Sequence, residues 1–225
     1  MSIEYACDDG IARIRFDDGK ANAMRTDWFR ALNDALDRAE KDGARAVVLR
    51  GRTGMFSGGL DVKWVPTLSG DAAHEMVETF SATMLRVWTF PIPTVAEITG
   101  HAVAGGCVLA CACDRRLALD GPYRIQMNEV LVRIALPSWA RAICASAFGP
   151  PWLDRLALLA EPLSPERCYD LGVVESLSET PEELHQAALA AARACAALDP
   201  HAFAVSKQRA RAAEAERVKA LVFSE

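Results

Sequence analysis

Hydrophobic and polar positions in the first fifty residues follow the patterns of a strand, a helix and a second strand. Between Ile11 and Phe16, apolar residues alternate with arginines, which is typical of a half-buried strand. From Thr26 to Lys41 apolar residues recur at helical spacing, with Thr26 as a candidate cap and Gly43 just past the end. Ala46–Leu49 is short and apolar, like a strand buried on both faces. Because parallel strands need such a crossover, the pattern predicts an α/β fold with helices against a sheet.

The alternation of strands and helices continues as far as Pro137, after which the pattern becomes helical. Helical spacing runs from Asp71 to Trp88 and ends before Pro91. Three later segments have the composition of short strands: Thr94–Ile98, Arg116–Leu119 and Tyr123–Met127. Beyond Pro137 the chain is rich in alanine and broken by proline and glycine turns, which indicates a helical C-terminal part.

The composition indicates a folded protein and disfavours two classes of partner. The 225 residues are 51% apolar and 24% charged, which are globular proportions. The formal net charge is −5 and basic residues are not concentrated, so we expect no nucleic-acid partner. No window approaches the ~20 uncharged apolar residues of a membrane span. The N-terminus is too acidic for a transit peptide and too polar for a signal sequence, so we expect a cytoplasmic protein without membrane contact.

The seven cysteines predict neither a disulfide framework nor a metal site. Their number is odd, and they are scattered among apolar neighbours. The closest group, Cys107, Cys111 and Cys113, lacks paired Cys-x-x-Cys spacing and has only His101 nearby as another type of metal ligand. We therefore expect reduced thiols packed as small apolar side chains.

Two glycine-rich turns, Phe56–Asp61 and Gly100–Gly106, each follow a predicted strand and precede a probable helix. In α/β sheets such turns expose backbone N–H groups at the carboxyl ends of strands, where ligands bind. The two turns are therefore candidates for the halves of one anion-binding site. The alternative is that the glycines only permit tight turns and close helix packing. Neither turn matches the phosphate-loop or the dinucleotide-binding pattern.

Glu129 is a candidate general base. It follows a predicted strand and has apolar neighbours, which raise a carboxyl pKa from its usual value of about 4.3 toward neutrality. A solvated loop glutamate is the alternative interpretation. The four histidines have no Gly-x-Ser-x-Gly context, so ordinary hydrolase chemistry is unsupported.

The same segments carry a resemblance to a known family. The shared motifs are Lys20–Met24, Phe56–Asp61, Gly100–Cys107, Cys113–Asp114, and Glu166–Gly172 followed by Val173–Glu175. On these motifs the chain resembles the enoyl-CoA hydratase/isomerase (crotonase) superfamily over nearly its whole length. The resemblance implies a ββα-spiral core with an acyl-CoA pocket over residues 1–172. It also implies a helical trimerisation region over residues 173–225, and hence a homotrimer or a dimer of trimers.

The resemblance also implies a set of site residues. The thioester oxygen would lie between the backbone N–H groups of Leu60 and Gly105, and the catalytic carboxylate would be Glu129. Other residues would contact the substrate, mostly through backbone atoms: Ala21, Ala23, Ser57, Gly58, Gly59, Asp61 and Asn128. Residues that could line the acyl tail, or could equally belong to the core, are Met24, Trp64, Met84 and Trp88. No metal and no cofactor are implied, because coenzyme A arrives as part of the substrate.

Val108 favours one reaction of this superfamily over another. The hydratases of this superfamily use two carboxylates to add water across a double bond. The position of the first carboxylate falls on Val108, which cannot transfer a proton. One base suffices to move a double bond, because Glu129 can take a proton from C2 and return it at C4. Ala104–Cys107 and Ile134–Trp139 also look most like the 3,2-trans-enoyl-CoA isomerase branch. We therefore expect an enoyl-CoA isomerase; an enoyl-CoA hydratase-like enzyme of fatty acid oxidation and a catalytically inactive CoA-binding protein are the alternatives.

Overall fold

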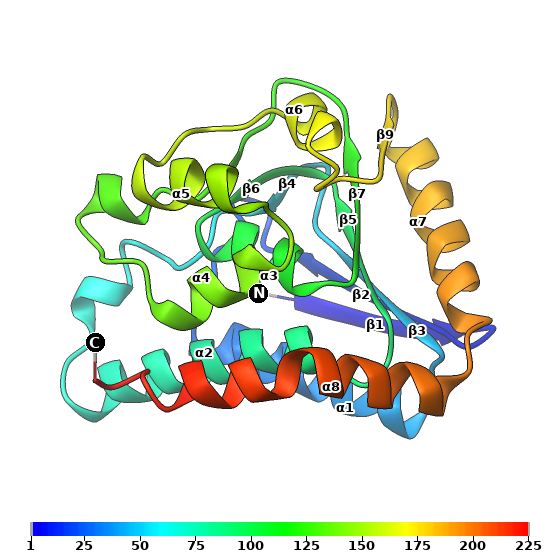
Figure 1. Ribbon diagram of the computed structural model, residues 1–225, viewed down its shortest axis with the longest axis horizontal. Helices are drawn as coiled ribbons and strands as arrows, with labels where there is room; N and C mark the ends of the chain where they lie inside the picture. The colour runs from blue at the N-terminus through cyan, green and yellow to red at the C-terminus, as the bar shows by residue number, and fades with distance from the viewer. Residues whose placement is uncertain (1, 225) are drawn as a thin grey trace.

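Two β-sheets wrapped by helices make up the computed structural model, which describes residues 2–224 (Figure 1). Met1 and Glu225, the outer limits of the two predicted regions, lie outside the described residues. The larger sheet has six strands in the order β1-β2-β3-β5-β7-β9, and the smaller has three in the order β4-β6-β8. The strands are β1 (Ser2–Asp8), β2 (Ile11–Asp17), β3 (Ala46–Arg50), β4 (Gly54–Ser57), β5 (Thr94–Ile98), β6 (Gly100–Val103), β7 (Arg115–Leu119), β8 (Ile125–Gln126) and β9 (Ser176–Ser178). The helices are α1 (Thr26–Lys41), α2 (Asp71–Thr89), α3 (Gly105–Ala112), α4 (Ser138–Ala145), α5 (Pro150–Leu158), α6 (Pro165–Asp170), α7 (Pro181–Ala196) and α8 (Pro200–Lys219), with 3₁₀ turns η1 (Val65–Thr67) and η2 (Glu129–Val132).

The larger sheet is covered on both faces around β3. Val47 and Leu49 face the main core, whereas Ala46 and Val48 face a second core formed with α7. Strand β1 is antiparallel to β2, and the remaining neighbours in this sheet are parallel. Burial on both faces explains why β3 has a continuous apolar run rather than an alternating pattern.

The smaller sheet brings the two glycine-rich turns together. Strand β4 is parallel to β6, and β6 is parallel to β8. Helix α3 begins directly after β6 and packs on β4 so closely that a Cβ atom on Gly106 would lie 2.1 Å from the carbonyl oxygen of Ser57. Glycine at position 106 is therefore required by close approach of the helix to the strand.

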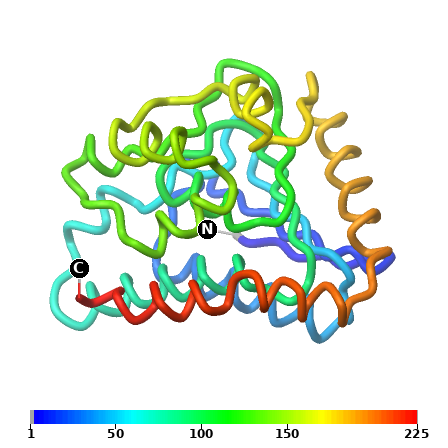
Figure 2. The backbone as a smooth tube through the Cα atoms, in the orientation of Figure 1, coloured from blue at the N-terminus to red at the C-terminus, as the bar shows by residue number. Residues whose placement is uncertain are grey.

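The two C-terminal helices pack on the core of the same chain. Helix α7 covers β3, β5 and β7, and α8 returns along α2 and α4 (Figures 1 and 2). Lys207 of α8 donates to Asp114 at 2.7 Å, and Arg211 donates to the other oxygen of Asp114 at 2.9 Å. The Lys207 side chain is only 4% exposed, so this ion pair anchors α8 beside the start of β7.

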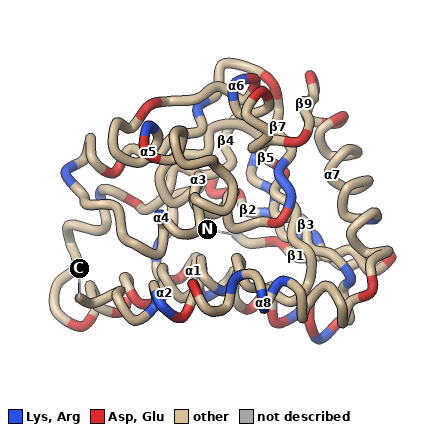
Figure 3. Tube along the Cα trace, viewed as in Figure 1, with Lys and Arg blue, Asp and Glu red and all other residues tan. Residues whose placement is uncertain are grey.

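Charges and cysteines follow the expectations from composition. Acidic and basic residues are interspersed along the trace (Figure 3). All seven cysteines are free thiols, and all but Cys7 are buried, as predicted. Within residues 2–224, no three histidine, cysteine or acidic side chains gather in a way that suits a metal ion. Among the helices of that part of the chain, none is both long and apolar enough to cross a bilayer.

The structure confirms several predicted elements and corrects others. Helix α1 and strand β5 have the predicted bounds. Thr26 is not the cap of α1, because it is the first helical residue; Arg25 occupies the cap position, and its side chain makes no capping hydrogen bond. The sequence patterns did not predict four strands: β1, β4, β6 and β9. Strands β4 and β6 are short and glycine-containing, so they lack a recognisable alternation.

Candidate active site

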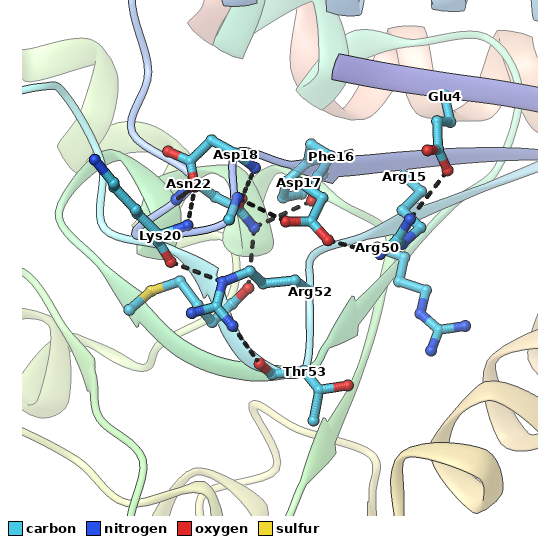
Figure 4. Close-up of polar contacts among 12 residues, drawn as sticks. Glu4, Arg15, Phe16, Asp17, Asp18, Lys20, Asn22, Arg50, Arg52 and Thr53 are labelled. Atoms are coloured by element: carbon cyan, nitrogen blue, oxygen red, sulfur yellow. Dashed lines mark hydrogen bonds and ion pairs between the residues drawn. The ribbon is translucent and has the colours of Figure 1, made fainter. Parts of the chain in front are cut away.

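The loop between β2 and α1 is held against β4 by the buried side chain of Asn22 (Figure 4). Its amide nitrogen donates to the carbonyl oxygens of Phe16, Met55 and Phe56, each at 3.1 Å. Its amide oxygen accepts from the backbone N–H of Asp18 at 3.0 Å. Asn22 has a φ of 48°, a conformation that asparagine tolerates better than most residues. The amide thus fixes Ala21 and Ala23 beside the end of β4.

Asp18 organises the other side of this loop. Its carboxylate accepts from the backbone N–H groups of Lys20 at 2.7 Å, Asn22 at 2.8 Å and Ala23 at 3.1 Å. Burial by itself would raise the pKa of Asp18, but these N–H donors hold it below its usual range. Arg52, which follows β3, donates to the Lys20 carbonyl oxygen at 2.8 Å (Figure 4).

Ser57 and Gly59 determine the conformation of the first glycine-rich turn. The Ser57 hydroxyl donates to the Asn22 carbonyl oxygen at 2.8 Å and accepts from the Gly59 N–H at 3.1 Å. Gly59 has a φ of +83°, and a Cβ atom there would lie 2.8 Å from the backbone nitrogen of Gly105. The two glycine-rich turns are therefore in contact, and neither Ser57 nor Gly59 lines a cavity.

The backbone N–H groups of Leu60 and Gly105 are free to bind an oxygen atom. Leu60 and Met24 form an isolated parallel bridge. In this bridge the Met24 N–H donates to the Gly59 carbonyl oxygen, and the Asp61 N–H donates to the Met24 carbonyl oxygen. No hydrogen-bond acceptor within the described residues takes the Leu60 N–H. Gly105 is the first residue of α3, where N–H groups have no partner inside the helix and the helix dipole favours negative charge. This geometry suits an oxyanion hole.

Ala104, which precedes this helix, has a strained backbone. Its φ of 50° and ψ of −124° are unusual for a residue with a side chain. The conformation is held by hydrogen bonds from its N–H to Gln126 at 2.8 Å and from the Val108 N–H to its carbonyl oxygen at 3.1 Å. Strain of this kind is retained where the surrounding structure fixes it, often at functional sites.

Leu60, Gly105 and Glu129 all line one cavity of about 300 Å³. Its wall is apolar apart from Asn128 and Glu129, and Glu129 is its one ionisable side chain among the described residues. The residues lining it are Gly58, Leu60, Val62, Val65, Met76, Val77, Phe80, Ala104, Gly105, Val108, Asn128, Glu129, Val132, Ile134, Pro137, Trp139 and Ala140. The cavity therefore combines one carboxylate, two free amides and a hydrocarbon surface.

Glu129 is half-buried, and its carboxylate is not fully hydrogen-bonded. Its Oε2 atom is inaccessible to solvent and has no hydrogen-bond partner. Burial raises the pKa of Glu129 above its usual value. Such a carboxylate has a raised pKa and an oxygen atom without a hydrogen-bond donor. It is therefore suited to accept a proton from a bound molecule.

A second, more open groove of about 610 Å³ adjoins this cavity, and Gly58, Leu60 and Val62 line both. Its other residues are Ala21 and Ala23, the basic Lys20, Arg25 and Lys63, and the acidic Asp18, Asp27 and Asp61. Arg25 donates to Asp61 at 2.6 and 2.9 Å, and the pKa of Asp61 is lowered by this guanidinium group and by backbone N–H donors. The groove is thus a polar approach to the apolar cavity, lined by basic and acidic side chains in equal number.

A comparison with known families identifies the family of this chain. A family model described as Enoyl-CoA hydratase/isomerase matches residues 6–223. The chain belongs to the enoyl-CoA hydratase/isomerase family. The resemblance seen in the sequence motifs is therefore confirmed, and the fold is that of the crotonase superfamily.

Relatives of this enoyl-CoA hydratase/isomerase family member cover almost all of its chain. It is 29% identical to human mitochondrial enoyl-CoA delta isomerase 1 over 220 residues, 96% of this chain and 72% of the relative. It is 29% identical to a probable enoyl-CoA hydratase of Bacillus subtilis over 214 residues, 90% of this chain and 79% of the relative. The crystal structure of human mitochondrial delta3-delta2-enoyl-CoA isomerase superposes with a TM-score of 0.92 at 27% identity, covering 97% and 86% of the two chains. Because both isomerase and hydratase names occur, the choice between these reactions depends on the cavity residues of this family member.

The structure changes the expected acyl-tail region of this family member. Met24, Met84 and Trp88 are buried in the main core and do not line the cavity. The wall is formed instead by α2 and α4, through side chains such as Met76, Phe80 and Trp139. Helical periodicity predicted a helix over Asp71–Trp88 but gave no sign of which helices would border the site.

Proposed function

We propose that this protein is an enoyl-CoA isomerase that converts 3-enoyl-CoA to 2-trans-enoyl-CoA. The observation that carries the proposal is the single ionisable side chain, Glu129, in a cavity that also presents the free N–H groups of Leu60 and Gly105. Moving a double bond by one position requires one proton removed from C2 and one proton delivered at C4. A single carboxylate can perform both transfers.

In the first step, Glu129 takes a proton from C2 of the substrate. The electrons of that C–H bond move toward the thioester carbonyl, and negative charge develops on its oxygen. The N–H groups of Leu60 and Gly105 would bind this oxygen, each donor contributing about 3 kcal/mol to the stability of the transition state. The apolar wall excludes water, which strengthens both hydrogen bonds.

In the second step, protonated Glu129 returns the proton at C4. The double bond then lies between C2 and C3, conjugated with the thioester. The raised pKa of Glu129 supports both steps, because a base must hold the proton long enough to deliver it at the second carbon.

The polar groove supports coenzyme A as the carrier of the acyl group. Lys20 and Lys63 would complement the phosphate charges of coenzyme A, whereas Arg25 is already paired with Asp61. The backbone at Ala21 and Ala23 would lie along the pantetheine and adenine portions. The thioester would then enter the apolar cavity past Gly58 and Leu60.

Hydration is the second candidate, and the hydratase names among the relatives favour it. Val108 opposes it, since this valine lines the cavity where a second carboxylate would be needed to position water. A catalytically inactive CoA-binding protein is the third candidate. Retention of a buried carboxylate at Glu129 argues against it, because burial of a charge is costly when it serves no reaction.

Formation of the conjugated thioester from 3-enoyl-CoA, followed by absorbance, tests the proposal. Glu129→Gln preserves size but cannot accept the proton, so we expect turnover to fall at least about 100-fold. Glu182→Gln, an exposed position on α7, is the matched control and should retain full activity. CoA binding should be unchanged in both variants. Undiminished turnover in Glu129→Gln would refute Glu129 as the base, and CoA binding without turnover by the wild type would favour the inactive protein.

A further inference from the structure

Three aromatic side chains form one continuous wall beside the proposed oxyanion hole. Phe80 of α2 stacks on Phe29 of α1, with ring centroids 5.0 Å apart and an angle of 21° between the rings. Phe80 also contacts Trp139 of α4 in an edge-to-face arrangement, with ring centroids 4.8 Å apart and an angle of 83° between the rings. Phe29 and Trp139 are almost fully buried, so they fix the position of the Phe80 ring between them.

The Phe80 ring also borders the reacting end of the cavity. A Cβ atom on Gly105 would lie 3.1 Å from the Cζ atom of Phe80, which places the tip of the ring beside the backbone that carries the oxyanion-binding N–H group. Phe80 is itself a lining residue of the cavity. The ring therefore stands where an acyl chain must leave the thioester.

Apart from Asn128 and Glu129, the cavity wall is apolar. Met76, Val77, Val65, Ile134 and Pro137 all contribute to it. No lysine, arginine, histidine, serine or threonine contributes to the wall among the described residues. A polar group on the acyl tail would lose its hydration there and would find no partner except Asn128 or Glu129.

We propose that Phe80 is the residue that determines how large an acyl tail fits. This inference rests on the proposed function, because it takes the cavity as the acyl site. A cavity of about 300 Å³ is at the small end of ligand pockets, so one ring of its wall has a large effect on capacity. Phe29 and Trp139 prevent the ring from swinging aside for a larger tail.

Binding of non-reacting, saturated thioesters tests this role independently of turnover. Hexanoyl-CoA and decanoyl-CoA differ only in the length of the hydrocarbon tail, and calorimetry measures the affinity of each.

Truncation of the ring tests the role of Phe80. In Phe80→Ala, the ratio of decanoyl-CoA to hexanoyl-CoA affinity should rise about tenfold, since the removed ring opens room for the longer tail. Phe203→Ala, on α8 away from the cavity, should leave that ratio unchanged. If Phe80→Ala does not fold, Phe80→Leu provides the same comparison with a smaller expected rise. An unchanged ratio in a folded variant would overturn the role of Phe80.

The outcomes also separate this inference from the proposed function. A higher decanoyl-CoA to hexanoyl-CoA affinity ratio in Phe80→Ala, without any isomerase turnover by the wild type, would overturn the isomerase proposal alone. Isomerase turnover by the wild type, with an unchanged ratio in folded Phe80→Ala, would overturn the role of Phe80 alone. Failure of every CoA thioester to bind would overturn both.

Discussion

At the scale of single residues, the proposed role of Glu129 sets the demands of catalysis against those of stability. Its Oε2 atom is buried without a partner, and burial raises its pKa. A group whose pKa is higher in the folded state than in the unfolded state makes folding less favourable as the pH rises. The property that makes Glu129 a useful base therefore reduces the stability of the protein near neutral pH.

Glu129→Gln should consequently be more stable than the wild type at neutral pH, by about 1 kcal/mol. The difference should shrink as the pH falls from about 7 toward 4.3, the ordinary pKa of glutamate, because the wild-type carboxylate becomes protonated. Urea unfolding of both proteins across this range measures it. Burial also raises the pKa of Glu97, but that residue is present in both proteins and cancels in the comparison. A wild type as stable as the variant at every pH would contradict the assigned burial cost.

Gly59→Ala should abolish most activity through geometry alone. Its Cβ atom would meet the nitrogen of Gly105 at 2.8 Å and displace an oxyanion donor, so we expect turnover to fall by about 100-fold. Gly54→Ala is a matched control, because Gly54 has nearly the same φ, +84° against +83°, with no atom within 4 Å of an added Cβ. Both variants should lose similar stability from backbone strain, but only Gly59→Ala should lose activity. Equal activity losses would show that strain and not the contact is responsible.

At the scale of secondary-structure elements, predictability depended on how local the signal was. Helix α1 and strands β3 and β5 carry their periodicity within the segment, and the sequence predicted them closely. Strands β4 and β6 exist because they pair with each other and with β8, a contact between distant segments that leaves little trace in local composition. The glycine turns and Glu129 were found from pattern and resemblance. Phe80 was missed because its role depends on packing of α2 between α1 and α4.

The attachment of α8 to the core depends on the buried ion pair of Asp114 with Lys207. Asp114→Asn should destabilise the protein by about 3 kcal/mol, because it leaves the almost completely buried Lys207 without a charged partner. Adding Lys207→Met in the same chain should recover part of this loss. Thermal or urea unfolding of the single and double variants checks both expectations. A double variant less stable than Asp114→Asn would contradict the cost assigned to the unpaired lysine.

At the scale of the whole molecule, one chain already contains every group of the proposed site. Leu60, Gly105 and Glu129 line one cavity, and the polar groove adjoins it in the same chain. The C-terminal helices bury one face against the core, with α7 on the larger sheet and α8 on α2 and α4. Assembly is therefore not needed to complete the catalytic groups.

The family resemblance nevertheless predicts self-association through the helical region of residues 173–225. Sedimentation equilibrium of the purified protein should give a mass of a trimer, or of a dimer of trimers, built from the 24.4 kDa chain. A monomer at micromolar concentration would remove this prediction. It would leave the proposed chemistry intact, because the site lies within one chain.

Mass spectrometry of the products formed from 3-enoyl-CoA in ¹⁸O-labelled water tests the single-base isomerase most directly. An enzyme with Glu129 as its only proton-transferring side chain, and with Val108 in place of a second carboxylate, should form the conjugated thioester with no oxygen incorporated. Hydrated product should appear far more slowly, if at all, both from 3-enoyl-CoA and from 2-trans-enoyl-CoA supplied directly. Rapid incorporation of one ¹⁸O atom, at a rate comparable to isomerisation, would contradict the proposed function and assign the protein to the hydratases.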